Sequence, residues 1–195
     1  WEKQQSRDAG GCSGENPSPR LMPKFIVYAC PVGELAEQLA TYFAKSRLAC
    51  GPNQAHHYMP HCTLTGFFED VTSSVPKYTQ TLERSLKRYR RSQPTPPLEV
   101  VHMRFGDDWH GLELSSDWLK KLMLDFVCTA TSPTRKSPLR PKDWLHVSLA
   151  YGFVADQAET LKALAQEVVN PEAPTDWELR FYQQNPDSSW LCHQR

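Results

Sequence analysis

Apolar residues at helical spacing predict four amphipathic helices. The first runs from about residue 33 to 49 and is ended by Gly51 and Pro52, and the second ends before the helix breaker "QPTPP" at residues 93–97. A stripe of apolar side chains three or four positions apart marks one face of each helix. These stripes are Leu35, Leu39, Tyr42 and Phe43; Tyr78, Leu82, Leu86 and Tyr89; Trp118, Leu119, Leu122 and Phe126; and Leu161, Leu164, Ala165 and Val168.

Runs of β-branched and aromatic residues between these helices predict strands. The segment "KFIVYAC", which begins at Lys24, is apolar almost throughout, as expected of a buried strand. The segments "LEVVHMRF" and "HGLELSS" form a predicted hairpin around the turn "GDDW". Trp177, Leu179 and Phe181 alternate in a last strand, which Pro186 closes.

Two further strands carry the same short motif. In "PHCTLTGFF" His61 lies two positions before Thr63, and in "LHVSLAYGF" His146 lies two positions before Ser148. Side chains at positions i and i+2 of a strand point to the same face, so each motif presents one imidazole and one hydroxyl together. A single motif of this kind is common, but two such motifs in matching strand contexts indicate that both contribute to one function.

The order of elements is strand, helix, motif strand, helix, strand, strand, helix, motif strand, helix, strand. Because this order contains two similar halves, we predict one α+β domain of two lobes, with the two motifs facing each other across a groove. Residues 1–21 combine Gly, Ser, Pro and charge and are expected to form a flexible arm. The domain is placed at residues 22–185, and residues 186–195 are expected to form a loose tail.

Length and composition limit the classes of protein to which this chain can belong. The 195 residues suit one domain, and the 22 basic and 22 acidic residues cancel, so an anionic ligand must be recognised locally. Six cysteines without a CxxC pair favour a reducing compartment. No apolar run has the length of a membrane helix, and no signal peptide is recognisable. We therefore expect a location in the cytoplasm or nucleus, and the start at Trp1 suggests a processed form or a fragment.

Two imidazoles and two hydroxyls around one groove suit the hydrolysis of a phosphodiester. A neutral histidine takes a proton from attacking water, and a protonated one donates to the leaving oxygen. The ordinary histidine pKa of about 6.5 makes both forms accessible near neutral pH. The hydroxyls of Thr63 and Ser148 would donate hydrogen bonds to the phosphate oxygens. His61 and His146 are thus the candidate catalytic residues, and the reaction requires no metal or other cofactor.

Several aromatic residues and histidines near the motifs are further candidates for a site. Tyr58, Tyr151 and Phe153 are candidate substrate contacts, although strict alternation from His146 turns Tyr151 away from the groove, and Phe153 lies beyond the strand. A zinc site at His56, His57 and His61 is disfavoured, because Pro60 disfavours the helix that would place His57 and His61 on one face and no acidic or thiol partner follows at useful spacing.

Two segments rich in Lys and Arg could contact a phosphate. The run "ERSLKRYRR" fits the solvated face of the second helix better than an RNA-binding patch, because its apolar positions bury the other face. The loop "TRKSPLRPK" at residues 134–142 leads directly into the second motif and is the better candidate for reaching a phosphate.

The paired motifs resemble those of the two-histidine (2H) phosphoesterase superfamily. Within it, "AHHYMPHCTLTGFF" and "DWLHVSLAYGF…TLKALAQ" look similar to the phosphoesterase domain of the TULA/Sts (suppressor of T-cell receptor signalling) proteins, over roughly residues 22 to 182. This resemblance implies a bilobal LigT-like fold, in which antiparallel sheets of two pseudo-symmetric lobes line a central groove. It also implies hydrolysis of 2′,3′-cyclic phosphates on nucleotides or RNA 3′ ends without a metal.

Two rival functions remain open at this stage. The first is a module that binds nucleotides or RNA ends and acts as a scaffold within a larger signalling protein. The second is a purely structural protein–protein domain. Two intact motifs favour turnover, because binding alone does not need two proton-transfer groups. The sequence leaves undecided which histidine is the acid, which phosphate product forms and which protein partners exist.

Overall fold

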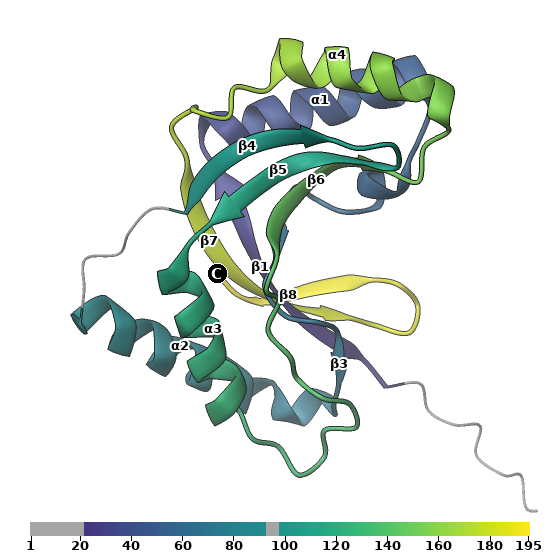
Figure 1. The fold of residues 1–195 in the computed structure, drawn as a ribbon. Coiled ribbons are helices and arrows are strands. Elements are labelled where there is room, and N and C mark those ends of the chain that lie inside the picture. The colour runs from purple at the N-terminus through teal and green to yellow at the C-terminus, as the bar shows by residue number, and fades with distance from the viewer. Residues whose placement is uncertain (1–21, 93–97) are drawn as a thin grey trace, which may run out of the picture.

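The structure is a computed structural model that describes residues 22–92 and 98–195. The predicted arm at residues 1–21 and the predicted helix breaker at residues 93–97 lie outside the described residues. Eight strands and four α-helices form within the described part of the chain (Figure 1). The strands are β1 (Lys24–Val32), β2 (Cys62–Thr63), β3 (Phe68–Glu69), β4 (Glu99–Phe105), β5 (Trp109–Ser115), β6 (Leu145–Tyr151), β7 (Asp176–Gln184) and β8 (Trp190–Gln194). The helices are α1 (Glu34–Cys50), α2 (Val75–Ser92), α3 (Asp117–Thr129) and α4 (Ala158–Val168), with short 3₁₀ helices at Gln54–His57, Thr72–Ser74 and Ala155–Gln157.

Strand β1 is an interior strand of the sheet, and both of its faces are buried. Its odd-numbered residues from Phe25 to Ala29 pack in the main core with side chains from the α-helices. Its even-numbered residues from Ile26 to Cys30 lie on the opposite face, in a smaller apolar cluster. This burial on two sides explains why the strand is apolar almost throughout. The α-helices therefore cover one face of the sheet and leave the other face for a site.

All strand pairs in the sheet are antiparallel, and their order is β4-β5-β6-β2-β1-β7-β8, with β3 also paired to β1. The two motif strands, β2 and β6, are direct neighbours in the middle of this order. Helix α1 packs with α4 towards one end of the molecule and α2 packs with α3 towards the other, as Figure 1 shows. An α+β fold with an antiparallel sheet is thus confirmed. Hydrogen bonds join the strands into one continuous sheet, and the pseudo-symmetry of two lobes stays a prediction.

The C-terminal tail differs from the expectation. Residues 186–195 were predicted to be loose, but Trp190–Gln194 form strand β8, which pairs with β7. Ser188, at φ 66°, lies in the turn between these strands. The Trp190 ring packs 6.0 Å from the ring of Tyr58, centroid to centroid. The prediction failed because Pro186 was read as the end of the last strand, whereas it opens the turn of a hairpin.

A buried carboxylate attaches the loop before the second motif to the rest of the domain. Asp70 is fully buried and accepts hydrogen bonds from the Tyr78 hydroxyl (2.7 Å), the Thr134 hydroxyl (2.5 Å) and the Val71 backbone N–H (2.7 Å). Burial raises the pKa of this carboxyl, but these hydrogen bonds and one from Ser132 outweigh it and hold the pKa below its ordinary value. The ionised form of Asp70 therefore stabilises the fold.

Replacing Asp70 with asparagine is expected to lower the free energy of unfolding at pH 7 by about 2–3 kcal/mol, because an amide is a poor acceptor for so many donors. Since the folded pKa of Asp70 is depressed, its contribution is present above the unfolded pKa of about 3.9 and is lost as the pH falls through the folded pKa. Urea unfolding of both proteins from pH 7 downwards measures this difference. A difference that stays constant at acid pH contradicts this role.

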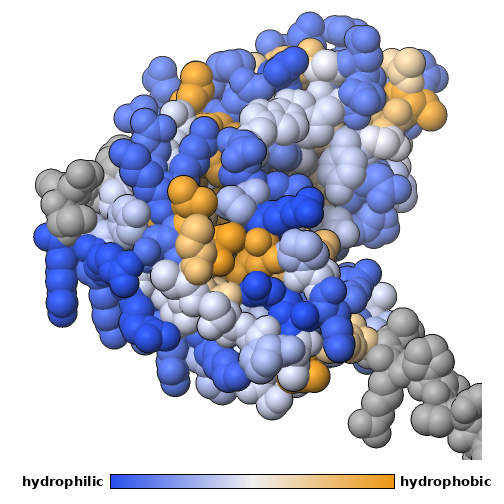
Figure 2. All heavy atoms as spheres, turned by 60° about the horizontal axis from the view of Figure 1, so that its bottom comes forward, coloured by the Kyte–Doolittle hydropathy of each residue, from blue (hydrophilic) through white to orange (hydrophobic). Residues whose placement is uncertain are grey.

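The surface agrees with the expected solvation of the second helix. Hydrophilic side chains cover most of the face in Figure 2, and apolar ones gather around its centre. The side chains of Lys87 and Arg88 on α2 are 66% and 62% exposed, and Arg88 pairs with Asp125 of α3.

Among the described residues, no helix combines the length and apolar character that a membrane crossing needs.

Candidate functional site

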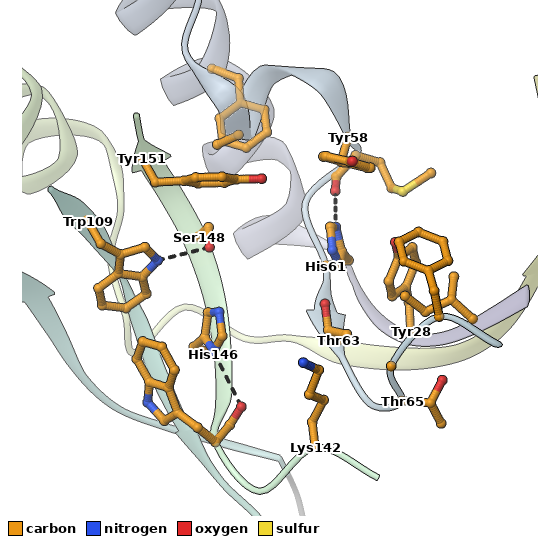
Figure 3. Close-up of a pocket in the computed structure, with 17 residues that line it drawn as sticks. Tyr28, Tyr58, His61, Thr63, Thr65, Trp109, Lys142, His146, Ser148 and Tyr151 are labelled. Carbon is orange, nitrogen blue, oxygen red and sulfur yellow. Dashed lines mark hydrogen bonds between the residues drawn. The ribbon is translucent and has the colours of Figure 1, made fainter. Parts of the chain in front are cut away.

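The two motifs lie side by side on the sheet face that the α-helices leave uncovered. Cys62 pairs with Val147 in antiparallel register, and both side chains are fully buried in the main core. The residues on either side of this pair therefore project to the opposite face. In this register His61 lies beside Ser148, and Thr63 lies beside His146, as Figure 3 shows. The predicted convergence of the two motifs is present, and it arises from direct strand pairing.

Both histidines are held in the same tautomer. Nδ1 of His61 lies 2.7 Å from the backbone oxygen of Met59, and Nδ1 of His146 lies 3.3 Å from that of Trp144. A carbonyl oxygen only accepts, so Nδ1 must carry the proton in each ring. In the neutral ring Nε2 is then a free acceptor that can take a proton from a ligand or water in the cavity.

The surroundings favour the neutral form of both rings. Burial lowers the pKa of His61, an effect that outweighs its bond to the Met59 carbonyl, and the charge of His146 lowers it further. Burial also lowers the pKa of His146, opposed by its bond to the Trp144 carbonyl, and the nearby ammonium of Lys142 lowers it further. Since His61 and His146 affect each other's charge, binding of one proton disfavours binding of a second.

The hydroxyls of the two motifs have different surroundings. Thr63 and Ser148 both line the cavity (Figure 3). Ser148 Oγ accepts a hydrogen bond from the indole Nε1–H of Trp109 at 3.0 Å. The Trp109 ring also contacts the ring of His146, with centroids 5.4 Å apart in an edge-to-face arrangement. One aromatic side chain of β5 thus touches both His146 and Ser148 of the second motif.

The four motif residues open into a cavity of about 510 Å³. Its walls are rich in aromatic side chains, namely Tyr28, Phe43, Tyr58, Phe67, Trp109, Trp144 and Tyr151. Among the described residues that line it, Lys142 is the one lysine or arginine, and there is no aspartate or glutamate. Figure 3 shows Lys142 extending towards the space between Thr63 and His146. The cavity therefore suits a ligand with an anionic group and flat or apolar parts.

The predicted orientation of Tyr151 is wrong. Alternation from His146 turned this side chain away from the groove, but Tyr151 lines the cavity (Figure 3). The register explains the difference: Gly111 of β5 pairs with Ser148, whereas the preceding residue of β5 pairs with Ala150. The strand β6 thus contains one extra residue, a β-bulge, which reverses the alternation beyond it.

The remaining two candidate contacts lie in different places. Tyr58 lines the cavity, and its ring meets that of His61 edge-on with centroids 5.8 Å apart. Phe153 is absent from the described lining of this cavity and packs on the buried ring of His110, with centroids 4.7 Å apart. Whether Tyr58 or Tyr151 contacts a substrate stays a prediction.

Three lining residues that contact the motif side chains were missed as site residues from the sequence, namely Trp109, Trp144 and Tyr28. Trp109 was read as part of a turn, whereas it begins β5. Trp144, two positions before His146, stacks on its ring with centroids 3.9 Å apart at 29°. Tyr28, whose ring centroid is 3.9 Å from that of His61, belongs to an apolar strand in which no sequence pattern distinguishes it from core residues. Lys142, in contrast, is the last residue of the loop at residues 134–142 that is the sequence-based candidate for reaching a phosphate, and it lines the cavity.

The arrangement suits acid–base chemistry more than metal binding. Among the described residues, no group of three or more His, Cys, Asp or Glu side chains is placed to hold a metal ion. Both ring nitrogens of His56, which the zinc hypothesis had included, are engaged: Nδ1 accepts from Asn53 N at 3.0 Å, and Nε2 lies 3.0 Å from Ser46 Oγ. Two neutral imidazoles and two hydroxyls around a cavity can instead move protons and bind an anion.

Comparisons with known proteins find homologues over most of the chain. It is 34% identical over 167 residues to ubiquitin-associated and SH3 domain-containing protein B of Mus musculus and, to the same extent, to the Homo sapiens protein of that name. It is 31% identical over 170 residues to the ecdysteroid-phosphate phosphatase of Bombyx mori. Each match covers 84% of this chain and 25% of the relative.

These homologues confirm the similarity to the TULA/Sts proteins. The chain spans about a quarter of the length of the curated relatives that it matches. No protein-family model matches the chain. The names of the relatives describe proteins about four times as long, so they do not say which part carries an activity.

Proposed function

We propose that this chain is a phosphodiesterase of the 2H type, which hydrolyses 2′,3′-cyclic phosphates of nucleotides or RNA 3′ ends by acid–base catalysis. The observation that carries the proposal is the pairing of the two motif strands, which brings His61, Thr63, His146 and Ser148 into one cavity. The phosphatase named among the relatives supports phosphoester chemistry in general. The cyclic substrate and the roles of the residues are the proposal itself.

The positions of the two histidines fit an in-line displacement. Diagonal neighbours on adjacent antiparallel strands have Cα atoms roughly 7–8 Å apart, which leaves room for a phosphoryl group between the imidazoles of His61 and His146. One neutral imidazole takes a proton from water as the water oxygen bonds to phosphorus. The other, protonated, imidazole gives its proton to the ribose oxygen as the bond from phosphorus to that oxygen breaks. The enzyme returns to its starting state when the two histidines exchange protons with solvent.

The anion is held by neutral donors and one nearby cation. The hydroxyls of Thr63 and Ser148 donate to the non-bridging oxygens, whose charge persists through the transition state. Lys142, which lines the cavity, adds attraction for the phosphate without having to touch it. The aromatic walls leave a largely apolar space beside the phosphate for the base or sugar. No step of this scheme calls for a metal.

The rate of hydrolysis is expected to be highest on the acid side of neutrality. Turnover needs one protonated and one neutral histidine, and burial lowers the pKa of both His61 and His146. The value of kcat/KM should therefore peak below pH 6.5, the ordinary pKa, and fall as the pH rises above it. A bound phosphate anion raises both pKa values, so the kcat profile should peak at higher pH. Rates from pH 4.5 to 8.5 test this, and a kcat/KM that increases up to pH 8 contradicts it.

The hydrolysis assay separates this function from the binding-module alternative. The purified chain is incubated with each of the four 2′,3′-cyclic nucleoside monophosphates in EDTA, and the 2′- and 3′-monophosphate products are separated by chromatography. One product isomer is expected, since a fixed acid protonates one ribose oxygen. Saturable binding of nucleoside monophosphates without any product supports the binding module. Absence of both supports a structural domain.

A further inference from the structure

The two motifs fix their hydroxyls by different means. In the first motif, Thr63 is β-branched, and its methyl group restricts rotation about χ1. In the second motif, Ser148 lacks that methyl group and is free to adopt three staggered rotamers. A hydroxyl that rotates between rotamers spends part of its time away from the ligand. In the second motif another interaction must therefore hold the hydroxyl in one orientation.

The indole of Trp109 provides such an interaction. Its Nε1–H donates to Ser148 Oγ at 3.0 Å. An indole nitrogen donates only, so Ser148 must be the acceptor in this contact, and its own proton stays available for another acceptor. We propose that Trp109 is a positioning residue that locks the Ser148 hydroxyl as a hydrogen-bond donor towards the phosphate. This inference rests on the proposed function of the same cavity.

The fold holds the Trp109 ring in place independently of Ser148. Trp109 and Gly111 lie two positions apart on β5 and share a face. A Cβ atom at Gly111 would collide with carbon atoms of the Trp109 six-membered ring, so the absence of a side chain there makes room for the indole. The ring of Trp144 packs on it with centroids 4.9 Å apart. The indole is thus fixed before any ligand binds, which makes it a suitable anchor for a mobile hydroxyl.

The register between β5 and β6 places Trp109 near Ser148. Trp109 pairs with Tyr151, and Gly111 pairs with Ser148, so three residues of β5 span four residues of β6. Ser148 lies opposite Gly111, two positions from Trp109 on the same face of the sheet, and Tyr151 lies beyond the β-bulge. The same irregularity turns Tyr151 into the cavity. The pairing of β5 with β6 therefore sets both the contact between Trp109 and Ser148 and part of the aromatic wall.

A double-mutant cycle tests the proposed role. Trp109→Phe keeps an aromatic ring and removes the donor, and it is expected to lower kcat about tenfold, the loss of one hydrogen bond, with little change in KM. In a Ser148→Ala background the same substitution should have no further effect on kcat, because the hydroxyl that it positions is gone. Equal losses in both backgrounds would show a merely structural role and overturn the proposal. The conservative change Ser148→Thr in the Trp109→Phe protein should restore part of the rate by restricting χ1.

A second measurement does not depend on turnover. The indole Nε1–H signal of Trp109, assigned by its loss in Trp109→Phe, is followed in ¹H–¹⁵N spectra of the wild-type protein and of Ser148→Ala. Loss of the acceptor should shift this signal, and an unchanged signal would show that the hydrogen bond is absent. The binding of inorganic phosphate, measured by calorimetry in the four proteins of the cycle, should show the same non-additivity as kcat. If the wild-type protein has no activity, the proposed function fails while these two readouts still decide the role of Trp109.

Discussion

Replacing His61 or His146 with alanine is expected to lower kcat for 2′,3′-cyclic nucleotide hydrolysis by a factor of about 10²–10⁴. In the proposed mechanism each substitution removes one of the two Nε2 atoms that exchange protons with water and the leaving oxygen, so neither histidine can replace the other. KM should change much less, because in the proposed mechanism the hydroxyls of Thr63 and Ser148 bind the phosphate and Lys142 attracts it. Initial rates at saturating substrate, near the pH of the wild-type maximum, measure the effect.

The control for these variants is His57→Ala. His57 is exposed on the 3₁₀ helix Gln54–His57, close in sequence to the first motif, and it is absent from the described lining of the cavity. Its replacement should leave kcat within a factor of about two. Because His61 packs on buried Tyr28, thermal unfolding of His61→Ala must show an intact fold before its rate is interpreted. If His61→Ala or His146→Ala keeps an intact fold and hydrolyses the substrate at the wild-type rate, acid–base catalysis by this pair is ruled out.

Replacing Thr63 with valine is expected to lower kcat by a factor of about 10²–10³, the effect of losing one donor to transition-state charge. Valine keeps the β-branched shape, so the packing of the motif strand is preserved while the hydroxyl is lost. The Thr63 hydroxyl lies in the cavity with both histidines, where water is partly excluded and a hydrogen bond to an anion is strong.

The matched control is Thr129→Val, an exposed position at the end of α3 whose hydroxyl bonds to backbone oxygens of its own helix. This variant should turn over at the wild-type rate. A phosphate titration of Thr63→Val separates loss of binding from loss of catalysis: the phosphate Kd should rise by less than kcat falls. Full activity in Thr63→Val would mean that the hydroxyl does not contact the reacting phosphate.

Local patterns in the sequence predicted the parts of the fold that depend on local periodicity. The helices follow from apolar stripes, and the predicted helix from about 33 to 49 corresponds to Glu34–Cys50, with Gly51 at φ 78° as its cap. The shared face of His61 and Thr63 followed from the period of two in a strand. The exclusion of Cys62 and Val147 from the cavity followed from the same rule, and both are buried in the core.

Features that depend on partners far away in the sequence were missed. The extra residue in β6 is visible only in its pairing with β5, so the orientation of Tyr151 came out reversed. Strand β8 is only five residues long and depends on β7 for its hydrogen bonds. Trp109 lies 39 positions from Ser148, and no local pattern connects an indole to a hydroxyl across two strands. Site residues supplied by neighbouring strands therefore required the structure.

The most direct test of the central claim compares the wild-type protein with the double variant His61→Ala/His146→Ala in one assay. Both are incubated with 2′,3′-cyclic AMP in EDTA at pH 6, and the product is followed by ³¹P NMR, which distinguishes the cyclic ester from either monophosphate. The account predicts steady conversion to one monophosphate by the wild-type protein and none above background by the double variant. Conversion at equal rates by both proteins would show that the paired motifs are not the catalytic centre.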